Sequence, residues 1–406
     1  MKKVLLLLSL VSLLFVTDLM ACTAAIFTGK VTPDGRPLMW KHRDNDVDNV
    51  CVEYIKGAKY NFIALMNSGR KTKYAWGGTN EAGFSIMNTA SYNLNYDVKY
   101  DKKFPDGENV MYRALSTCAT LADFEKMLTE EYMGTRNESN FGVIDAHGGA
   151  AYYEVGINGW TKIDVNDPKI APQGCLVYAN HSYTGKLNDG EGYIRYTNAD
   201  HLVKSHIGRA GEFTPQWIFQ NLSRSFRHSL LDIDLVKDAE ITERGSGWFI
   251  AQDFIPRISS TSAIVLAGVK EGDDPANSIM YTILGYPPVS VAVPMFMKAG
   301  ADQPSWMTPT AESKNAKMCD FALELKKDIF PVKRGNGKYY MNFRKIHNSD
   351  GTGYMQQLRP LENEIFEKTG KFIEENRDKG YNKAVYDKFY NDLYEQIKTT
   401  YKNIVK

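Results

Sequence analysis

Short runs of apolar and β-branched residues, separated by Gly, Asn and Asp, dominate the chain from residue 22 to about residue 293. Runs of this kind, bounded by turn residues, predict β-strands. The clearest of them cover residues 23–29, 37–44, 61–66, 83–87, 141–144, 150–155, 176–179, 262–266, 279–284 and 289–293. Two helical stretches interrupt the strands, one over residues 108–130 with a break near Thr120 and one from Thr214-Pro215 to about residue 226. Strands in clusters and helices in blocks predict an α+β fold rather than a doubly wound parallel sheet.

The last hundred residues change character. They are rich in Lys, Glu, Tyr and Asn and show helical periodicity over residues 359–404. Apolar side chains recur there at steps of three and four, at Tyr386, Phe389, Tyr390, Leu393, Tyr394 and Ile397. This stripe predicts a helical C-terminal extension over residues 301–406 that packs on the body of the protein. A contact within a homo-oligomer is the alternative.

The beginning of the chain has the pattern of an export signal. Lys2 and Lys3 precede an apolar run over residues 4–16 that is too short to span a bilayer as a stable anchor, and the small Ala21 precedes Cys22. The pattern predicts a signal peptide over residues 1–21 and a mature chain that is periplasmic or secreted, with no integral membrane segment after processing. Residues 22–300 then form the main domain.

Charge and cysteine spacing narrow the classes of function. A formal net charge of +1 gives no support to nucleic-acid binding or to polybasic membrane binding. Neither a CxxC pair nor an HExxH motif is present, so no metal site is predicted. Apart from Cys22 the cysteines are Cys51, Cys118, Cys175 and Cys319. These four either pair in an oxidising compartment or remain buried free thiols.

Cys22 is the residue that carries chemistry. Cleavage after Ala21 would give this one residue a thiol nucleophile and a free α-amino group whose reference pKa is about 8, which can take the thiol proton at neutral pH. The competing interpretation is a lipobox, in which Cys22 is lipidated and anchors a surface protein. A tethered lipoprotein usually carries a flexible leash after its cysteine, whereas residues 23–29 read at once as a strand. The sequence therefore favours the free nucleophile.

Three polar residues are candidates to assist Cys22. The turn Thr32-Pro33-Asp34-Gly35 predicts a hairpin that returns Asp44 to the side of Cys22, where a carboxylate can hold the α-ammonium group. Asn88 and Asn180 stand at strand ends, where their amides can donate to an oxyanion. Asp44, Asp46 and Asp48 alternate as in a calcium loop, but the glycine and the terminal glutamate of an EF-hand are missing.

These residues occur within a set of motifs that resembles a known superfamily. In order, the motifs are Cys22-Thr23, Asp34-Gly35, Lys41-His42-Arg43-Asp44, Thr79-Asn80-Glu81-Ala82-Gly83-Phe84 and Tyr178-Ala179-Asn180-His181. Together they resemble the N-terminal-nucleophile (Ntn) amide hydrolases, and within them the choloylglycine hydrolase and penicillin acyltransferase-like branches. The strand pair around residues 141–145 and Glu154 resembles the acyltransferase-like group. The similarity extends from Cys22 to about residue 294.

The resemblance implies a four-layer αββα sandwich in which Cys22 opens a central strand. It also implies that Cys22 is the nucleophile, that Asp44 positions it, and that Asn180 and Asn88 form the oxyanion hole. Bile-salt hydrolases usually have an arginine three positions before this aspartate, whereas here Lys41 keeps the charge without the bidentate fork and Arg43 is a possible substitute.

Arg195 is a second departure from that family. It ends the stretch Gly192-Tyr193-Ile194-Arg195, which lacks the first arginine of the family's pattern. We therefore regard Lys41, Arg43 and Arg195 as candidate substrate-binding residues, with Arg195 alternatively part of a polar network.

The leading hypothesis is an exported hydrolase, acting on C–N bonds other than peptide bonds, that cleaves linear N-acyl amides through a Cys22 thioester. Acyl transfer to an amine is a possible second activity. No cofactor is required, and the expected partner is a small-molecule amide. The aromatic residues Trp40, Tyr54, Tyr92 and Trp160 suggest an apolar acyl group, although they are also ordinary core residues. The alternatives are a dipeptidase of the same superfamily and a lipid-anchored non-catalytic surface protein.

Overall fold

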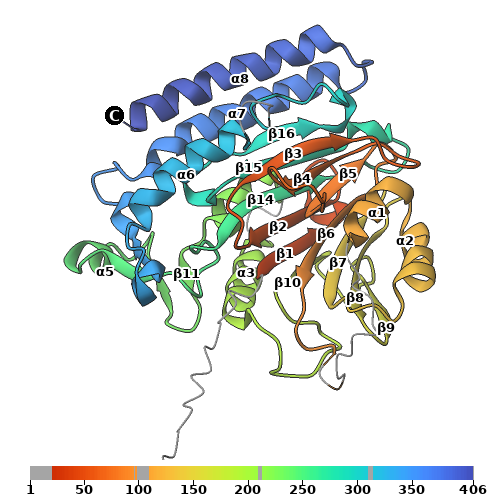
Figure 1. The fold of residues 1–406 in the computed structure, drawn as a ribbon, viewed down its shortest axis with the longest axis horizontal. Helices are drawn as coiled ribbons and strands as arrows, with labels where there is room; N and C mark the ends of the chain where they lie inside the picture. Colours follow the sequence, from red (N-terminus) through yellow and green to blue (C-terminus); the bar gives the residue numbers. More distant parts are fainter. Residues whose placement is uncertain (1–20, 96, 98–108, 209–212, 310–313, 406) are drawn as a thin grey trace, which may run out of the picture.

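A computed structural model describes residues 21–95, 97, 109–208, 213–309 and 314–405. Most strands belong to two antiparallel sheets (Figure 1). A six-stranded sheet has the order β10 (Cys175–Tyr178), β1 (Cys22–Phe27), β2 (Leu38–Asp44), β14 (Ser260–Ala267), β15 (Ile279–Leu284) and β16 (Val293–Phe296). A seven-stranded sheet follows chain order, with β3 (Val50–Ile55), β4 (Phe62–Asn67), β5 (Gly77–Asn80), β6 (Ser85–Ala90), β7 (Ser139–Ile144), β8 (Ala150–Gly156) and β9 (Gly159–Asp164).

The two sheets stack face to face, with β1 packed on β6 and β14 on β5. Because side chains alternate along a strand, β1 contributes side chains to both faces of the six-stranded sheet. Ala24 and Ile26 enter the core between the sheets, whereas Ala25 and Phe27 enter a second core beneath the helices. Gly77 is needed where the sheets approach most closely, since a Cβ there would lie 2.6 Å from the side chain of Ile264.

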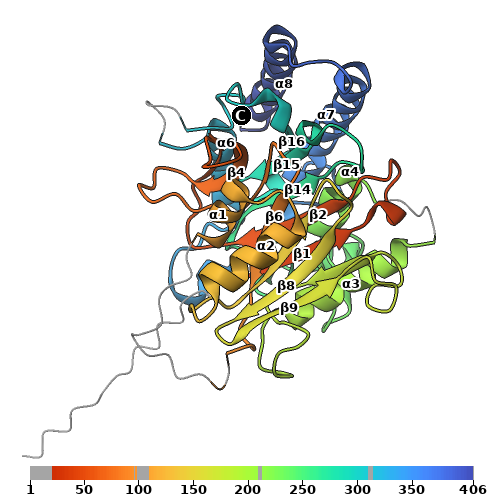
Figure 2. The ribbon, with the colours of Figure 1, turned by 90° about the vertical axis from the view of Figure 1, so that its right-hand side faces the viewer.

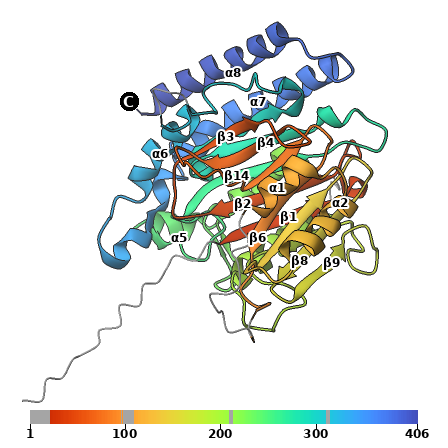
Figure 3. The same cartoon turned by 45° about the vertical axis from the view of Figure 1, so that its right-hand side comes forward.

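Helices cover the outer faces of both sheets (Figures 2 and 3). On the seven-stranded sheet these are α1 (Val110–Thr117) and α2 (Leu121–Met127), the latter continued by a π-helical turn, Leu128–Tyr132. On the six-stranded sheet they are α3 (Tyr193–His206), α4 (Pro215–Ile218) with its π-helical turn Phe219–Ser223, α7 (Tyr354–Asn376) and α8 (Lys383–Ile404). The layers are therefore αββα, as the resemblance predicts.

The remaining elements include one longer helix, α6 (Lys317–Ile329), whose apolar face joins the main core. The others are the helix α5 (Ala239–Arg244), and the small strand pairs β11 (Arg227–His228) with β12 (Ile233–Asp234) and β13 (Trp248–Ile250) with β17 (Tyr340–Asn342). The 3-10 turns are Gly29–Val31, Pro275–Asn277, Pro287–Val289, Met297–Ala299, Gly335–Tyr339 and Phe343–Lys345. None of the helices described has the length and apolar character needed to cross a bilayer.

Local sequence signals explain several element boundaries. The β1–β2 hairpin turns at Gly35, whose φ of 73° favours glycine. The predicted break near Thr120 is confirmed, because Thr120 caps α2 in a reciprocal capping box with Asp123. The predicted helix start at Thr214-Pro215 is also confirmed, since the Thr214 side chain accepts a hydrogen bond from the N–H of Trp217.

Two predicted ranges are wrong in detail. The strand predicted over residues 289–293 is mostly absent, because the Pro287-Pro288 pair fixes a 3-10 turn and strand pairing begins only at Val293. The helical stretch predicted over residues 359–404 is two helices. Asn382 caps the second of them by accepting hydrogen bonds from the backbone N–H groups of Ala384 and Val385.

The C-terminal segment lies against the six-stranded sheet and contributes one strand as well as helices. In the stripe on α8, Tyr386, Tyr390, Leu393 and Ile397 are buried. The hydroxyl of Tyr390 accepts a hydrogen bond from the backbone N–H of Phe296, 3.2 Å away, at the end of β16. Strand β17 also pairs with β13 of the main body, so the segment is not purely helical.

Candidate active site

Cys22 is the first residue of β1, on a strand that is neither edge of its sheet. It is 6% exposed and pairs in register with Arg43 of β2. The backbone N–H of Asp44 donates to the carbonyl oxygen of Ala21 at 2.9 Å. The predicted hairpin is therefore confirmed, and it brings Asp44 beside the residue that precedes the cysteine. Alternation along β1 turns the Cys22 side chain toward the seven-stranded sheet, as for Ala24.

Asn180 and Arg195 hold the backbone of Cys22. The N–H of Cys22 donates to Asn180 Oδ1 at 3.0 Å, and Arg195 Nη2 donates to the same oxygen at 2.7 Å. Arg195 Nη1 also donates to the carbonyl oxygen of Cys22 at 2.9 Å and to Thr23 Oγ1 at 2.8 Å. Asn180 Nδ2 donates to the carbonyl oxygen of Ala90 at 2.9 Å. The structure thus turns the amide oxygen of Asn180 toward the Cys22 nitrogen, and its role as an oxyanion donor stays a prediction.

Arg195 is buried on the helix side of β1, with 2% of its surface exposed. Burial lowers its pKa to about 10, which leaves the side chain charged at neutral pH. Its contacts are with Cys22 and Thr23 of β1 and with Asn180, which fits the network alternative better than substrate binding.

The carboxylate of Asp44 lies in a buried polar cluster at the end of β2. It accepts hydrogen bonds from Arg257 Nε at 2.8 Å and from Ser260 Oγ at 2.6 Å. Burial alone would raise the pKa of Asp44, but the charge of Arg257 and the Ser260 hydrogen bond outweigh it, so the pKa lies below its usual value. The carboxylate points to the helix side of the sheet, opposite to the Cys22 thiol, and its action on the α-amine stays a prediction.

His42 completes this cluster as a neutral imidazole. Ser260 Oγ uses its proton toward Asp44, so His42 Nε2, 2.8 Å from Ser260 Oγ, must be the donor in that contact. His42 Nδ1 then carries no proton and is buried without a hydrogen-bond partner. Burial lowers the pKa of His42 to about 4, despite the nearby Asp44 carboxylate. The 3.8 Å contact of His42 with Asp44 is therefore not an ion pair at neutral pH.

The buried neutral state of His42 predicts acid lability. In the unfolded chain this histidine titrates near its reference value of about 6.5. Its contribution to stability is complete above that pH and is lost as the pH falls toward about 4, its folded pKa. We expect the free energy of unfolding to fall by about 3 kcal/mol across this interval. Urea unfolding at a series of pH values measures it.

The matched variant for this prediction is His42→Gln, whose amide keeps a donor for Ser260 and has no proton to gain. It should have a shallower dependence of stability on pH between the same limits. An equal slope in the variant and the wild type would assign the effect to other groups.

Lys41 and Arg43 line the other face of β2, between the sheets. Lys41 Nζ donates to Asn88 Oδ1 and to the carbonyl oxygen of Trp76, both at 2.7 Å. Arg43 donates to Thr261 Oγ1 and to Asn67 Oδ1, both at 3.0 Å, and its guanidinium group lies 4.4 Å from the ring centre of Trp76. The structure thus brings Lys41, Arg43 and Asn88 to the side of the sheet that Cys22 faces.

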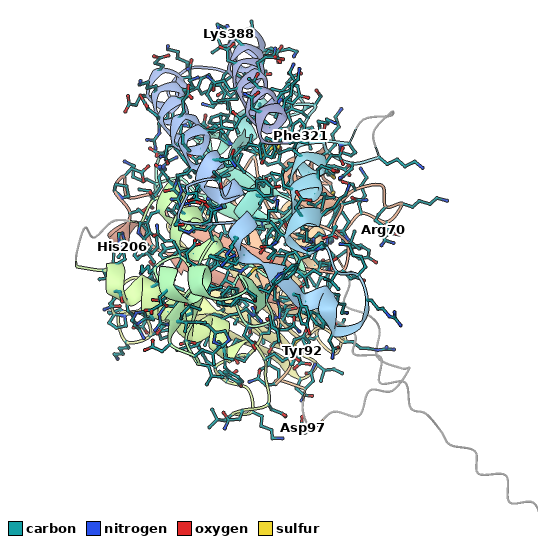
Figure 4. The ribbon with its side chains drawn as sticks, turned by 90° about the vertical axis from the view of Figure 1, so that its left-hand side faces the viewer. Arg70, Tyr92, Asp97, His206, Phe321 and Lys388 are labelled. Atoms are coloured by element: carbon teal, nitrogen blue, oxygen red, sulfur yellow. The ribbon has the colours of Figure 1, made fainter. Side chains whose placement is uncertain are left out.

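A cleft of about 850 Å³ opens beside this cluster. Its lining includes Asn67, Trp76 and Asn88, the partners of Lys41 and Arg43, together with the apolar Val110 and Phe141. Its other lining residues include Asp46, Arg70, Lys71, Tyr74, Met111 and Arg136. Figure 4 places Arg70 at the periphery of the molecule. The cleft is of the size that holds a small molecule. Cys22 and Arg43 are not among its lining residues, but Arg43 contacts two that are, Asn67 and Trp76, and pairs in register with Cys22.

The four aromatic residues suggested by the sequence lie elsewhere. Trp40 is buried in the helix-side core and donates to Ser223 Oγ at 2.7 Å. Trp160 and Tyr54 pack against the main core. Tyr92 lies near Cys22, since a charge on that cysteine helps to raise the pKa of the Tyr92 hydroxyl after the larger effect of burial. None of the four lines the described cleft, where Tyr74, Trp76 and Phe141 are the aromatic residues.

All five cysteines lie in the described part of the chain, and each is a free thiol. Burial raises the pKa of Cys51 and Cys175 to about 12, and that of Cys118 and Cys319 to about 11. These four thiols are therefore unreactive at neutral pH. Within the described residues no cluster of three or more His, Cys, Asp or Glu is arranged to hold a metal ion.

Arg257, Ser260 and Trp76 are site residues that the sequence did not single out. Arg257 is 213 positions from Asp44, and only the pairing of β14 with β2 brings them together. The sequence does place Arg257 just before a buried strand. That position indicates a contact with Asp44 only once the order of the strands in the sheet is known.

The site belongs to an αββα sandwich with a cysteine at the start of an internal strand. Structural comparison finds a mutant of conjugated bile acid hydrolase from Clostridium perfringens, with 13% identity over 68% of this chain and 92% of the other and a TM-score of 0.42. It also finds penicillin V acylase from Agrobacterium tumefaciens, with 14% identity over 68% and 86% of the two chains and a TM-score of 0.35. Penicillin G acylase from Alcaligenes faecalis matches at 11% identity over 50% and 52%, with a TM-score of 0.34.

The first two matches carry the names of the kinds of enzyme that the motifs resemble. Because the TM-scores lie below 0.5, the description of the fold rests on the strand order and layers of the chain itself. No protein-family model matches the sequence, and no curated protein matches it.

Proposed function

We propose that this chain is an exported Ntn hydrolase that cleaves linear amides through a thioester on Cys22. The observation that carries the proposal is the position of Cys22, whose nitrogen and carbonyl oxygen are held by Asn180 and Arg195 at the start of an internal strand. Removal of residues 1–21 turns that held nitrogen into an α-amine. The nucleophile and its base are then fixed in one geometry before substrate arrives.

The proposed reaction has two steps. In the first, the α-amine takes the thiol proton, the sulfur attacks the acyl carbonyl, and the tetrahedral intermediate collapses to a thioester as the proton passes to the leaving amine. In the second, the α-amine takes a proton from water, which attacks the thioester and releases the carboxylic acid and the thiol. An amine in place of water would give acyl transfer. Asn88 and Asn180 are the proposed oxyanion donors, and Asp44 with Arg257 sets the local charge.

The burial of the peptide between Ala21 and Cys22 favours processing before folding. Ala21 is 1% exposed and its carbonyl oxygen is bonded to Asp44. A peptidase needs an extended, accessible segment, so we propose that the leader is removed during export and that folding then buries the new terminus. The same burial leaves little room for a diacylglyceryl group on Cys22, which argues against the lipid-anchored alternative.

The cleft supports an apolar acyl group. Tyr74, Trp76, Val110, Met111 and Phe141 supply apolar surface beside the polar cluster. Candidate substrates are N-acyl amino acids, fatty amides, bile-acid conjugates and phenylacetyl amides.

Intact mass spectrometry tests the proposal. We expect the exported protein to begin at Cys22 with a free amine, and to gain the mass of one acyl group when it is mixed with an acylated amine and quenched rapidly. The Cys175→Ala variant, which lacks a half-buried thiol on β10, should form the same adduct. A terminus blocked by lipid, or an adduct that is lost in Cys175→Ala, would contradict the proposal.

A further inference from the structure

Lys41 is a lysine buried between the two sheets. It lies on β2 in register with Ala24 of β1 and Ile264 of β14, and 1% of its surface is exposed. Its ammonium group donates to the carbonyl oxygen of Trp76 and to Asn88 Oδ1, both at 2.7 Å.

These contacts fix the orientation of the Asn88 amide. An ammonium group has three donors and no acceptor, so Asn88 can meet it only with its oxygen. The amide nitrogen must then point away from Lys41, and it lies 3.5 Å from Ser139 Oγ. Asn88 and Ser139 both line the cleft. A contact of 3.5 Å is at the limit of a hydrogen bond, so a stronger acceptor in the cleft can take that donor.

We propose that Lys41 is a positioning residue for amide hydrolysis, whose ammonium group locks the Asn88 side chain so that Nδ2 donates to the oxyanion of the tetrahedral intermediate. The inference rests on the function proposed above. A neutral lysine keeps two N–H donors and gains a lone pair, so after loss of the proton it can bind the Asn88 amide through either its oxygen or its nitrogen, and the amide is no longer held in one orientation. Its oxygen would then face the cleft and repel the oxyanion. An arginine at this position has no such neutral state at ordinary pH.

The surroundings of Lys41 place its titration within an accessible range of pH. Burial lowers its pKa to about 8, with Cys22 raising it and Arg43 on the same strand lowering it further. The other groups that face it are uncharged, namely Ala24 on β1, Ile264 on β14, Asn88 on β6 and Trp76. Lys41 therefore keeps its proton below about pH 8 and loses it above. The α-amine of Cys22 acts in its neutral form, so its own titration should make kcat/KM rise with pH. This rise is opposite in sign to the fall that loss of the Lys41 proton should cause.

The test is the dependence of kcat/KM on pH, from about pH 6 to about pH 10, with the best acylated amine as substrate. In the wild type we expect kcat/KM to fall about tenfold per pH unit above about pH 8, as one proton is lost. In Lys41→Arg this alkaline limb should move up by at least about one pH unit. In Asn88→Ala, kcat/KM should be about 10²- to 10³-fold lower at neutral pH, and the limb should disappear because no amide is left to rotate.

Lys298→Arg is the control, because Lys298 is a partly buried lysine beside Asp274 and the C-terminal helices. In this variant the alkaline fall of kcat/KM should occur at the same pH as in the wild type. The inference is overturned if the alkaline fall of kcat/KM occurs at the same pH in Lys41→Arg as in the wild type, or if it persists in Asn88→Ala. If Lys41→Arg fails to fold, Asn88→Ala alone decides. An acyl adduct on Cys22 together with an unmoved limb refutes only the role of Lys41, whereas the absence of any adduct refutes the proposed function.

Discussion

Cys22→Ala is expected to abolish turnover, lowering kcat/KM by about 10⁴- to 10⁶-fold, while the protein still folds. The thiol is the only group in the proposed reaction that forms a bond to the acyl carbon, so neither the α-amine nor the oxyanion donors can replace it. Alanine preserves the backbone N–H and carbonyl groups that Asn180 and Arg195 bind. The measurement is the rate of amine release from a panel of N-acyl amines and free dipeptides, which also separates an amidase from a dipeptidase.

The companion variant is Cys22→Ser, which retains a weak nucleophile next to the same amine. Its thermal unfolding midpoint should match that of the wild type within a few degrees, so that a loss of activity reports on chemistry and not on folding. Activity of Cys22→Ala equal to that of the wild type would exclude Cys22 as the nucleophile.

Of the substitutions proposed, Glu362→Gln is expected to lower the free energy of unfolding the most, by about 3 to 5 kcal/mol. Glu362 on α7 forms a bidentate pair with Arg224, with contacts of 2.7 and 2.5 Å, and the two side chains are 2% and 4% exposed. Arg224 also donates to the carbonyl oxygens of Pro287 and Ser290. The substitution leaves the buried guanidinium group without its counter-charge, which is costlier than the loss of a hydrogen bond. Urea unfolding at neutral pH measures the change.

Glu367→Gln on the same helix is the matched control. Glu367 pairs with Lys371 at the surface, where each side chain is 66% exposed and solvent screens the pair. We expect its unfolding free energy to stay close to that of the wild type. If Glu362→Gln were as mild as this control, the buried pair would not hold α7 to the sheet.

The elements that local sequence governs could be predicted. Asp34-Gly35, a turn signal between two predicted strands, was enough to predict the β1–β2 hairpin and the return of Asp44 toward Cys22. Thr120 and Thr214 marked helix starts because capping is a contact within one turn. Cys22 was singled out from the pattern of residues 1–21, which needs no tertiary information, and its role as nucleophile stays a prediction.

The rest of the site depends on how the sheets pair and stack. Arg257 reaches Asp44 only through the β2–β14 pairing, and Lys41 meets Asn88 only across the gap between the sheets. Neither contact leaves a periodicity in the sequence. The four aromatic residues that the sequence suggested do not line the cleft for the same reason, because local sequence does not show on which side of a sheet an aromatic residue lies. Trp40, for example, lies on the opposite side of the six-stranded sheet from Phe141, which lines the cleft.

The placement of α8 has a practical consequence for handling the protein. The helix ends at Ile404 and packs at the end of β16, and strands β2, β14 and β15 lie between β16 and β1 in the sheet (Figure 1). Purification tags, fluorophores and surface-immobilisation handles can therefore be fused after this helix at a distance from Cys22. Under the proposed function, the same additions before Cys22 would be removed together with residues 1–21, or would cap the amine on which the proposed reaction depends.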